Sequence, residues 1–372
     1  MLVWSRRSLL AGAALLPGAL QVRGNPANSA LNLGIIGTGG RGQLVGGFFA
    51  ADERVRVAAL CDLYDDRIEQ ARAAIHGART APVYKDYREL LAAPGIDAVL
   101  IATPVFLHPE HFEAAAAAGK HVYCEKPAGA DVAGVRRVER AALAARPTQH
   151  LVFGFQQRYS PEYRAAEEVI ASGRLGELLF MESRWVKGGA NFQNPPSPYP
   201  PEERRIRNWW ANRETSGDMI VEQDCHGIDV LNWFAKATPL SAIGAGGRKK
   251  RANGDNLDHL TVTFEYPGGL RGTLIATQLT PVAHRDIRET FVGTSGLIET
   301  ARNYWSWERP DQPTQRADSK REITIDSVEA FVDAVLGGRP QNLTARACTS
   351  TLTALLGRLA IDSRREVKWN EL

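Results

Sequence analysis

A glycine-rich turn between a short apolar run and a helix-like segment constrains the fold of this chain most. The apolar run covers residues 31–36, a helical pattern covers residues 43–51, and the turn between them reads Gly37-Thr38-Gly39-Gly40-Arg41-Gly42. Glycines at this spacing allow a tight turn, a close approach of the backbone to a diphosphate, and close packing of helix on strand. The helix N-terminus then offers free N–H groups and a positive dipole end to phosphates. The sequence therefore predicts a dinucleotide-binding unit whose cofactor ligands come from all six turn residues.

An acidic residue at the end of the next apolar run indicates the type of dinucleotide. Residues 55–61 are largely apolar and lead into Asp62, about 20 residues beyond the last glycine of the turn, where a carboxylate reaches the adenosine ribose hydroxyls. The same carboxylate would repel a 2′-phosphate, which favours NAD. Arg67 could swing toward the ribose and soften that preference, so NADP stays open as an alternative. A surface turn is the other interpretation of Asp62.

Alternating strand-like and helix-like segments continue through the first half of the chain. Residues 98–104 form an apolar run of the kind found in parallel sheets, residues 110–118 an Ala-rich helix, and residues 119–124 another strand. This alternation predicts an α/β fold with a Rossmann doubly wound parallel sheet, whose ligands sit at the carboxyl ends of the strands. The candidate cofactor residues at these ends are Thr103, Pro104, His108, Glu125 and Lys126.

The second half of the chain changes to strands that alternate and are joined by turns. Strand-like runs are expected at residues 178–186, 242–244, 260–266, 272–278 and 288–293, with amphipathic helices at 327–336 and 344–363. We expect an α+β domain with a large open, mainly antiparallel sheet. The predicted division is residues 1–30 as signal and linker, 31–150 as the nucleotide-binding domain, and 151–372 as the substrate and oligomerisation domain.

Length and composition exclude several classes of protein. The 372 residues predict roughly two domains, the net charge is only +3, and the basic residues form no sustained stripe, so nucleic acid is not an expected partner. No apolar run approaches the ~20 residues that cross a bilayer. The four cysteines are far apart in sequence and show no zinc-site spacing, which predicts structural thiols and no metal.

The N-terminal residues resemble a twin-arginine export signal. Arg6-Arg7 is followed by a weakly apolar run over residues 11–20. This pattern predicts export to the periplasm; a disordered start is the other interpretation, and the protein stays cytoplasmic if the signal is not used. Because this route carries folded proteins, the dinucleotide would travel inside the enzyme. It would then have to be held tightly and reset within each turnover or by a second substrate.

Residues 216–229 carry the second cluster of candidate catalytic groups. Read as one helix, this segment places Glu222, His226 and Asp229 on the same face, so an acid and an imidazole can reach one pocket. A divalent ion on Glu222, Asp224 and His226 is an alternative, but hydride transfer does not need one. Upstream, the Pro-, Asn- and Arg-rich residues 187–212 include Trp209, which could be a platform for a sugar ring or part of an arm that packs on another subunit.

The glycine turn, Asp62, Thr103-Pro104, His108 and above all Glu125-Lys126-Pro127 resemble the glucose-fructose oxidoreductase, inositol dehydrogenase and rhizopine catabolism (Gfo/Idh/MocA) family. The resemblance implies that Lys126 hydrogen-bonds the reacting hydroxyl and that His226 is its acid/base. It also places Arg158 and Tyr159 near cofactor and substrate, and implies a homo-oligomer, a dimer or tetramer. The family usually has aspartate four residues before the histidine, where this chain has Glu222, so the substrate class is not transferred.

Together these features predict an NAD(P)-dependent oxidoreductase that acts on a secondary hydroxyl of a sugar, sugar derivative or glycoside. We expect a largely desolvated Lys126 to have a lowered pKa and to relay a proton. One alternative is an NAD-dependent glycoside hydrolase that oxidises its substrate transiently, eliminates the aglycone and returns the hydride. The other is a non-enzymatic sugar-binding module with a vestigial nucleotide site.

Overall fold

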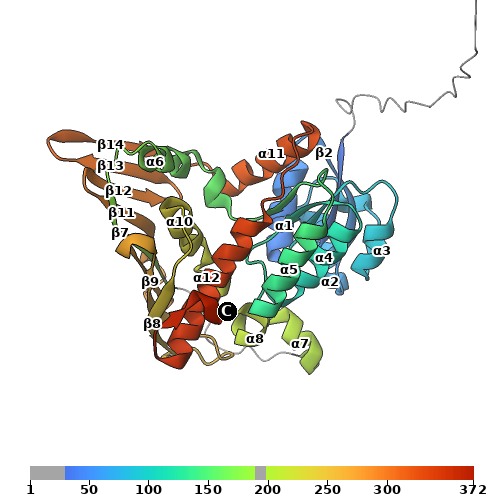
Figure 1. Cartoon of the computed structure of the whole chain (residues 1–372). Helices are drawn as coiled ribbons and strands as arrows, with labels where there is room; N and C mark the ends of the chain where they lie inside the picture. Colours follow the sequence, from blue (N-terminus) through green and yellow to red (C-terminus); the bar gives the residue numbers. More distant parts are fainter. Residues whose placement is uncertain (1–29, 189–197) are drawn as a thin grey trace, which may run out of the picture.

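The computed structural model describes residues 30–188 and 198–372, which build two sheets joined through a layer of helices (Figure 1). The first sheet has six parallel strands in the order β3-β2-β1-β4-β5-β6. This is the strand order of a dinucleotide-binding Rossmann sheet, so the predicted α/β class is confirmed. Its strands are β1 (Leu31–Ile36), β2 (Val55–Cys61), β3 (Val83–Tyr84), β4 (Ala98–Ile101), β5 (His121–Cys124) and β6 (Leu151–Phe153).

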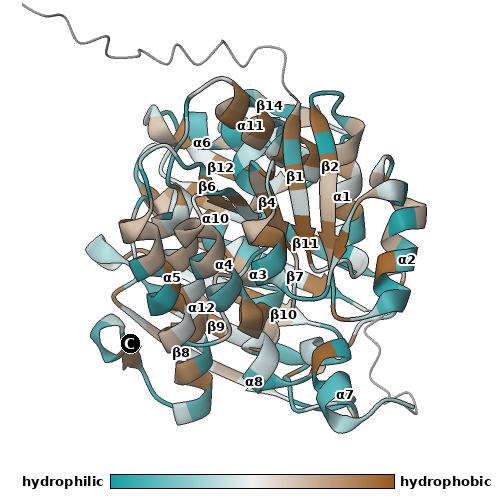
Figure 2. Cartoon of the chain, turned by 90° about the vertical axis from the view of Figure 1, so that its right-hand side faces the viewer, coloured by the Kyte–Doolittle hydropathy of each residue, from teal (hydrophilic) through white to brown (hydrophobic). Residues whose placement is uncertain are grey.

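Helices cover both faces of this sheet, which explains why its strands are apolar throughout. In β4 all four residues are buried, as expected for a parallel strand with helices on either side. The helices are α1 (Gly40–Ala51), α2 (Asp65–Ala74), α3 (Tyr87–Ala92), α4 (His108–Ala117) and α5 (Val132–Ala144). In Figure 2 the hydrophobic colour gathers on the strands between them, whereas α2 and the outlying α7 (Pro201–Arg207) are largely hydrophilic.

The second sheet has nine strands in the order β14-β13-β12-β11-β7-β10-β9-β8-β15. Neighbours are antiparallel except β7 and β10, which run parallel, so the expected large, mainly antiparallel sheet is confirmed. The sequence patterns missed β12, β13, β14 and β15. The strands are β7 (Leu178–Lys187), β8 (Ser241–Gly247), β9 (His259–Glu265), β10 (Arg271–Thr277), β11 (Arg285–Gly293), β12 (Gly296–Ala301), β13 (Tyr304–Arg309), β14 (Gln312–Asp318) and β15 (Val367–Lys368).

Three helices lie on one face of the second sheet, between it and the Rossmann unit: α6 (Pro161–Ala171), α10 (Cys225–Ala235) and α12 (Thr344–Ser363) (Figure 1). The strands follow this one-sided cover, because β9 and β10 alternate buried residues with more exposed ones. Within residues 30–188 and 198–372, no α-helix lies on the opposite face of the sheet (Figure 1). Residues that lie on the covered face of the strands therefore point toward the nucleotide-binding unit.

The penultimate helix, α11 (Ile323–Leu336), packs on the Rossmann sheet although it follows the second sheet in sequence. Its Phe331 ring meets Phe49 of α1 and Tyr123 of β5, edge to face, with centroid separations of 5.6 and 5.7 Å. This packing ties the two sheets together. All four cysteines are buried free thiols, and in the described part of the chain no helix is long and apolar enough to cross a membrane.

Candidate functional site

A cavity of about 640 Å³ opens at the carboxyl ends of β1, β2 and β4. The predicted cofactor residues that line it are Gly37, Gly39, Gly40, Arg41, Asp62, Thr103 and Pro104. Trp209, predicted to contact substrate, lines the same cavity. Thr38 and Gly42 lie behind the lining: Thr38 is fully buried and bonds to Asp62, and Gly42 packs on the backbone of the turn.

The glycines of the turn have the roles that a bound dinucleotide requires. Gly37 has φ +88°, and a Cβ there would lie 2.8 Å from the Ala102 backbone. A Cβ on Gly42 would stand 2.0 Å from the Gly37 carbonyl oxygen, whereas one on Gly39 or Gly40 would meet nothing within 4 Å. Helix α1 has neither a side-chain cap nor an acid in its first turn. The open backbone and uncapped helix end fit a diphosphate.

Asp62 is held in place at the end of β2. Its Oδ2 accepts hydrogen bonds from the backbone N–H of Thr38 at 2.8 Å and from the Thr38 hydroxyl at 3.2 Å, and its Oδ1 accepts from Tyr64 N–H at 3.1 Å. The cations around this end of the cavity already have carboxylate partners: Lys85 pairs with Asp65, and Arg207 with Asp66. An oriented carboxylate suits the ribose of NAD. Arg67 also lines the cavity, 3.9 Å from Asp66, and is the cation that a 2′-phosphate would meet there.

The structure places His108 outside the cavity. It is buried between the carbonyl oxygens of Pro127 and Thr103, at 2.7 and 2.9 Å from its ring nitrogens, and burial lowers its pKa. It therefore links the loops after β4 and β5. His111, one turn further along α4, does line the cavity; its Nδ1 lies 3.0 Å from the Thr103 hydroxyl. Sequence reasoning missed His111, although the i, i+3 spacing with His108 was visible.

Glu125 and Lys126 each bring a partly buried ion pair to the site. Glu125 receives Arg41 at 2.9 Å, and the Lys126 Nζ lies 3.3 Å from Glu222 Oε1 and also donates to the Glu222 carbonyl. Burial alone would lower the pKa of Lys126, but attraction by Glu222 outweighs it and raises that pKa above its usual value. The expectation of a lowered pKa for Lys126 was therefore wrong; the side chain is an ammonium group.

His226 presents a buried imidazole next to this ammonium. Its ring stacks on Trp185 with a centroid separation of 5.6 Å and an interplanar angle of 8°, and its Nδ1 has no hydrogen-bond partner. Burial is the first cause that holds the pKa of His226 well below its usual range, and the Lys126 charge is the second. A neutral imidazole with an unpaired nitrogen can accept a proton from a ligand.

The segment that carries Glu222 and His226 is broken, whereas one helix was predicted. Helix α9 (Met219–Glu222) ends at Gln223, and α10 begins at Cys225. Asp229, one helical turn beyond His226, binds Arg158 through two hydrogen bonds of 2.8 and 2.9 Å. These two predicted substrate ligands are thus partners of each other, and the break leaves Glu222 directed at Lys126.

The remaining predicted residues have packing partners of their own. Tyr159, a predicted substrate ligand, accepts a hydrogen bond from Arg346 at 2.9 Å. Asp224 is fully buried, accepts from the Gln223 amide at 2.9 Å, and has its pKa raised well above the usual range by burial, which disfavours the charged carboxylate. Within residues 30–188 and 198–372, no group of three His, Cys, Asp or Glu side chains is arranged to hold a metal ion.

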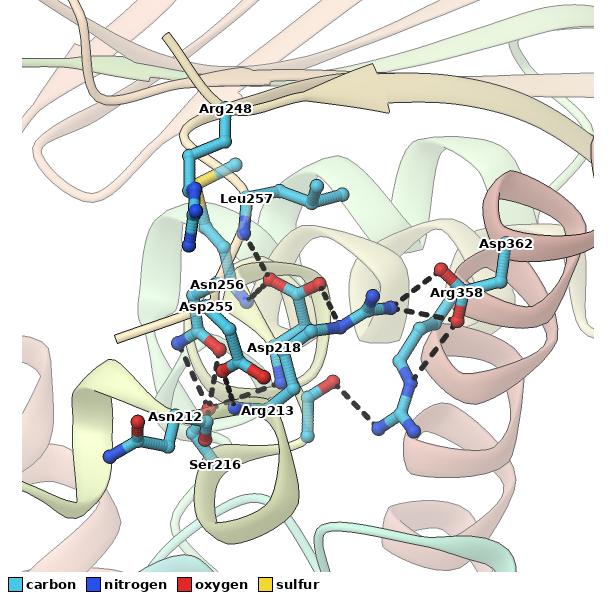
Figure 3. A network of polar contacts seen from close by, with 12 residues as sticks. Asn212, Arg213, Ser216, Asp218, Arg248, Asp255, Asn256, Leu257, Arg358 and Asp362 are labelled. Atoms are coloured by element: carbon cyan, nitrogen blue, oxygen red, sulfur yellow. Dashed lines mark hydrogen bonds and ion pairs between the residues drawn. The ribbon is translucent and has the colours of Figure 1, made fainter. Parts of the chain in front are cut away.

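A polar network connects the segment that carries Glu222 to the loop that follows Lys126 (Figure 3). Asp218, with φ +80°, caps α9, accepts from Leu257 N–H at 2.8 Å, and pairs with Arg213 at 3.0 Å. Arg358 of α12 donates to the carbonyls of Ala130, in the loop after Lys126, and of Gly217, just before α9. The Arg358 guanidinium therefore links the loop that follows Lys126 to the segment that leads into α9 and Glu222.

Two family models match the chain. The "Oxidoreductase family, NAD-binding Rossmann fold" model covers residues 31–151, and the "GFO/IDH/MocA C-terminal domain" model covers residues 163–299. The chain is 39% identical to inositol 2-dehydrogenase of Pseudomonas savastanoi pv. phaseolicola over 321 residues, 82% of this chain and 83% of that protein. It is 27% identical to the rhizopine catabolism protein MocA of Rhizobium meliloti, over 86% and 92% of the two chains.

Solved structures show the same fold. Levoglucosan dehydrogenase in complex with NADH and levoglucosan superposes with a TM-score of 0.78 at 19% identity, over 91% of this chain and 99% of that one. Lactobacillus casei scyllo-inositol dehydrogenase with NAD(H) and scyllo-inositol gives 0.74 at 19% identity, over 92% and 100%. With the cavity, the glycine turn and Asp62, the family models and the match to inositol 2-dehydrogenase identify an NAD-dependent enzyme acting on CH–OH groups. The chain belongs to the Gfo/Idh/MocA family of oxidoreductases.

Proposed function

We propose that this protein oxidises a secondary hydroxyl of a sugar or sugar derivative with an NAD molecule that it holds tightly. The observation that carries the proposal is the buried ammonium of Lys126 near the neutral, unpaired imidazole of His226. A polyol substrate is supported by the similarity to inositol 2-dehydrogenase. Bound NAD supplies the hydride acceptor.

Lys126 and His226 have different roles at the substrate oxygen. Lys126 donates a hydrogen bond to the hydroxyl oxygen and stabilises the negative charge that develops there, which a buried cation does more strongly than one in water. His226 accepts the hydroxyl proton, because its imidazole is neutral. Glu222 keeps Lys126 charged and oriented. In the reductive direction the protonated His226 returns the proton.

Helix α7 (Pro201–Arg207), here called the strap, comes from the second half of the chain and supports tight binding of NAD. Helix α7 places Ile206 and Arg207 in the cavity lining. Arg207 donates two hydrogen bonds of 2.9 and 2.6 Å to Asp66 at the start of α2, and its guanidinium lies 4.0 Å from the Tyr64 ring centroid. The cavity therefore has walls from both halves of the chain, which supports a slow release of NAD.

Retention of NAD is important because we propose that the enzyme is exported from the cytoplasm. The Arg6-Arg7 pattern, which lies outside the described residues together with the rest of the predicted signal, supports export through the twin-arginine route. A retained NAD suits an exported enzyme that resets its cofactor in each cycle. Transient oxidation followed by glycoside cleavage needs the same retention.

One experiment tests the proposed function. The purified protein is denatured to release and identify any dinucleotide, and the intact protein is incubated with free sugars and with aryl glycosides while nicotinamide absorbance and free aglycone are recorded. We expect bound NAD and reduction by free sugars. Aglycone release without net reduction of the cofactor would refute the dehydrogenase and support the glycoside hydrolase. If the protein contains no dinucleotide and its activity needs none, both functions are refuted.

A further inference from the structure

Two cations on neighbouring strands face each other without a carboxylate between them. Lys187 ends β7 and Arg285 begins β11, and the two are register partners in this antiparallel pair. Directly opposite residues share a face of the sheet, and like charges there repel. Among the described residues, neither side chain makes an ion pair or a side-chain hydrogen bond. Arg285 is exposed, so water screens part of this repulsion, and a bound anion would turn it into attraction.

A third unpaired cation comes from the turn after β12. The Arg302 guanidinium lies 5.4 Å from the Trp185 ring centroid, and its Nε is buried without a hydrogen-bond partner. The described residues offer it no carboxylate within 4.0 Å. An unpaired buried charge is costly, and such groups are usually matched by a counter-charge. The nearby Glu289 carboxyl forms no ion pair with Arg302: it accepts hydrogen bonds from Tyr163 and Thr300, and burial raises its pKa to about 7.

These cations lie on the side of the sheet that faces the catalytic residues. Side chains alternate along β7, so Lys187 shares a face with Trp185, whose ring stacks on His226. Arg302 reaches the same tryptophan ring. Both Lys187 and Arg302 are close enough to His226 to contribute, after burial and Lys126, to the lowering of its pKa. Lys187 and Arg302 therefore lie near the imidazole that we propose as the base, and Arg285 lies next to Lys187.

The acidic side chains near these three cations do not neutralise their positive charge. Glu125 is engaged by Arg41, and Glu222 by Lys126. Asp224 lies near Lys187, but burial raises its pKa well above the usual range and so disfavours its charged form. The Glu322 carboxylate interacts electrostatically with Arg302 and Arg41. It caps α11 and accepts hydrogen bonds from the backbone N–H and the hydroxyl of Thr324.

We propose that the substrate carries an anionic group, the carboxylate of a sugar acid, which binds among Lys187, Arg285 and Arg302 while its secondary hydroxyl faces Lys126 and His226. This inference rests on the proposed function and names its substrate class. Guanidinium and ammonium groups bind carboxylates and phosphates by charge-assisted hydrogen bonds. A sugar phosphate offers the same chemistry, so the experiment contains an arm for it.

The test compares sugars that differ in charge alone. The NAD-loaded protein is assayed with glucuronate against glucose, galacturonate against galactose, and glucose 6-phosphate against glucose. We expect kcat/KM at least about tenfold higher for a carboxylate sugar than for its neutral partner, the effect of one charge-assisted hydrogen bond. A preference for the phosphate over both would assign the site to sugar phosphates, and equal or better use of the neutral sugars would overturn the proposal.

Variants assign the effect to the cations. Lys187→Met and Arg302→Met should lower kcat/KM for the anionic sugar toward that of the neutral one and leave the NAD content unchanged. Arg184→Met is the matched control, because Arg184 lies on the opposite face of β7 and pairs with Asp286. An equal loss in Arg184→Met would contradict the assignment.

A binding measurement keeps this inference separate from the proposed function. Glucuronate should raise the Tm of the NAD-loaded wild-type protein more than glucose does, and Lys187→Met should abolish that difference. If glucuronate binds in this way but no sugar reduces the cofactor, the proposed oxidation fails and the anionic site stands. If glucose and glucuronate stabilise the protein equally, the anionic site is refuted even where sugars are oxidised.

Discussion

Alanine substitutions in the glycine turn distinguish two requirements of the cofactor site. One glycine is needed for close packing of α1 on the turn, and another for the approach of the diphosphate. A Cβ at position 42 would stand 2.0 Å from the Gly37 carbonyl oxygen, so α1 must move away by roughly 1 Å or more to restore an ordinary contact. Overpacking of this kind costs about 1–3 kcal/mol of stability. A displacement of about 1 Å can also cost about 100-fold in rate. Gly42→Ala should therefore lower both Tm and kcat/KM.

Gly39→Ala should behave differently, because its Cβ meets nothing within 4 Å in the protein. We expect an unchanged Tm without NAD, but a dissociation constant for NAD that rises by about tenfold or more, since the methyl group occupies the space through which a diphosphate approaches. Gly47→Ala is the control: it lies in α1 with open space around its Cβ, and should gain up to about 1 kcal/mol with no change in NAD binding.

Calorimetric titration with NAD and thermal unfolding of the three variants provide the measurements. The explanation of the turn is refuted if Gly39→Ala binds NAD as tightly as the wild type, or if Gly42→Ala unfolds at the wild-type temperature. A loss of NAD binding in Gly47→Ala would show that any substitution in α1 disturbs the site, and would remove the basis for the comparison.

The remaining predictions concern the catalytic groups and the strap. Lys126→Met should retain NAD and lower kcat by about 100-fold or more, measured by sugar-dependent reduction of the cofactor; undiminished turnover would remove Lys126 from the mechanism. Glu222→Gln removes the carboxylate that raises the pKa of Lys126, so burial then lowers that pKa, the ammonium is lost at lower pH, and the alkaline decline of kcat/KM should move to lower pH than in the wild type. An unshifted alkaline limb would contradict that role. Arg207→Met should speed the loss of NAD during dialysis without changing Tm by more than a few degrees, because the Arg207–Asp66 pair bridges the strap and the nucleotide-binding unit; an unchanged rate of loss would refute the strap.

The nucleotide-binding half could be predicted from sequence because its signals are local. The run at residues 31–36 matches β1, and the glycine turn leads directly into α1. Glycine spacing and an apolar parallel strand report backbone requirements that neighbouring residues alone impose. The six-stranded order then follows from a well-defined topology.

The second half was harder because its sheet edge is polar and its site is assembled from distant segments. All seven residues of β14 are exposed, so no apolar alternation marks it as a strand. The start of α9 depends on Asp218, whose positive φ and tertiary hydrogen bonds no helical pattern reveals, and α9 ends at Gln223 after a single turn. The cluster of Lys187, Arg285 and Arg302 appears only once three strand ends are placed in one sheet.

Rapid mixing of the NAD-loaded protein with a sugar deuterated at the reacting carbon tests the central claim most directly, because it follows hydride transfer within one turnover. We predict that reduced nicotinamide forms in the first turnover, more slowly for the deuterated sugar than for the protiated one, and that Lys126→Met suppresses this phase. Product formation without any reduced nicotinamide, at a rate indifferent to deuterium, would contradict the assignment of hydroxyl oxidation to this site.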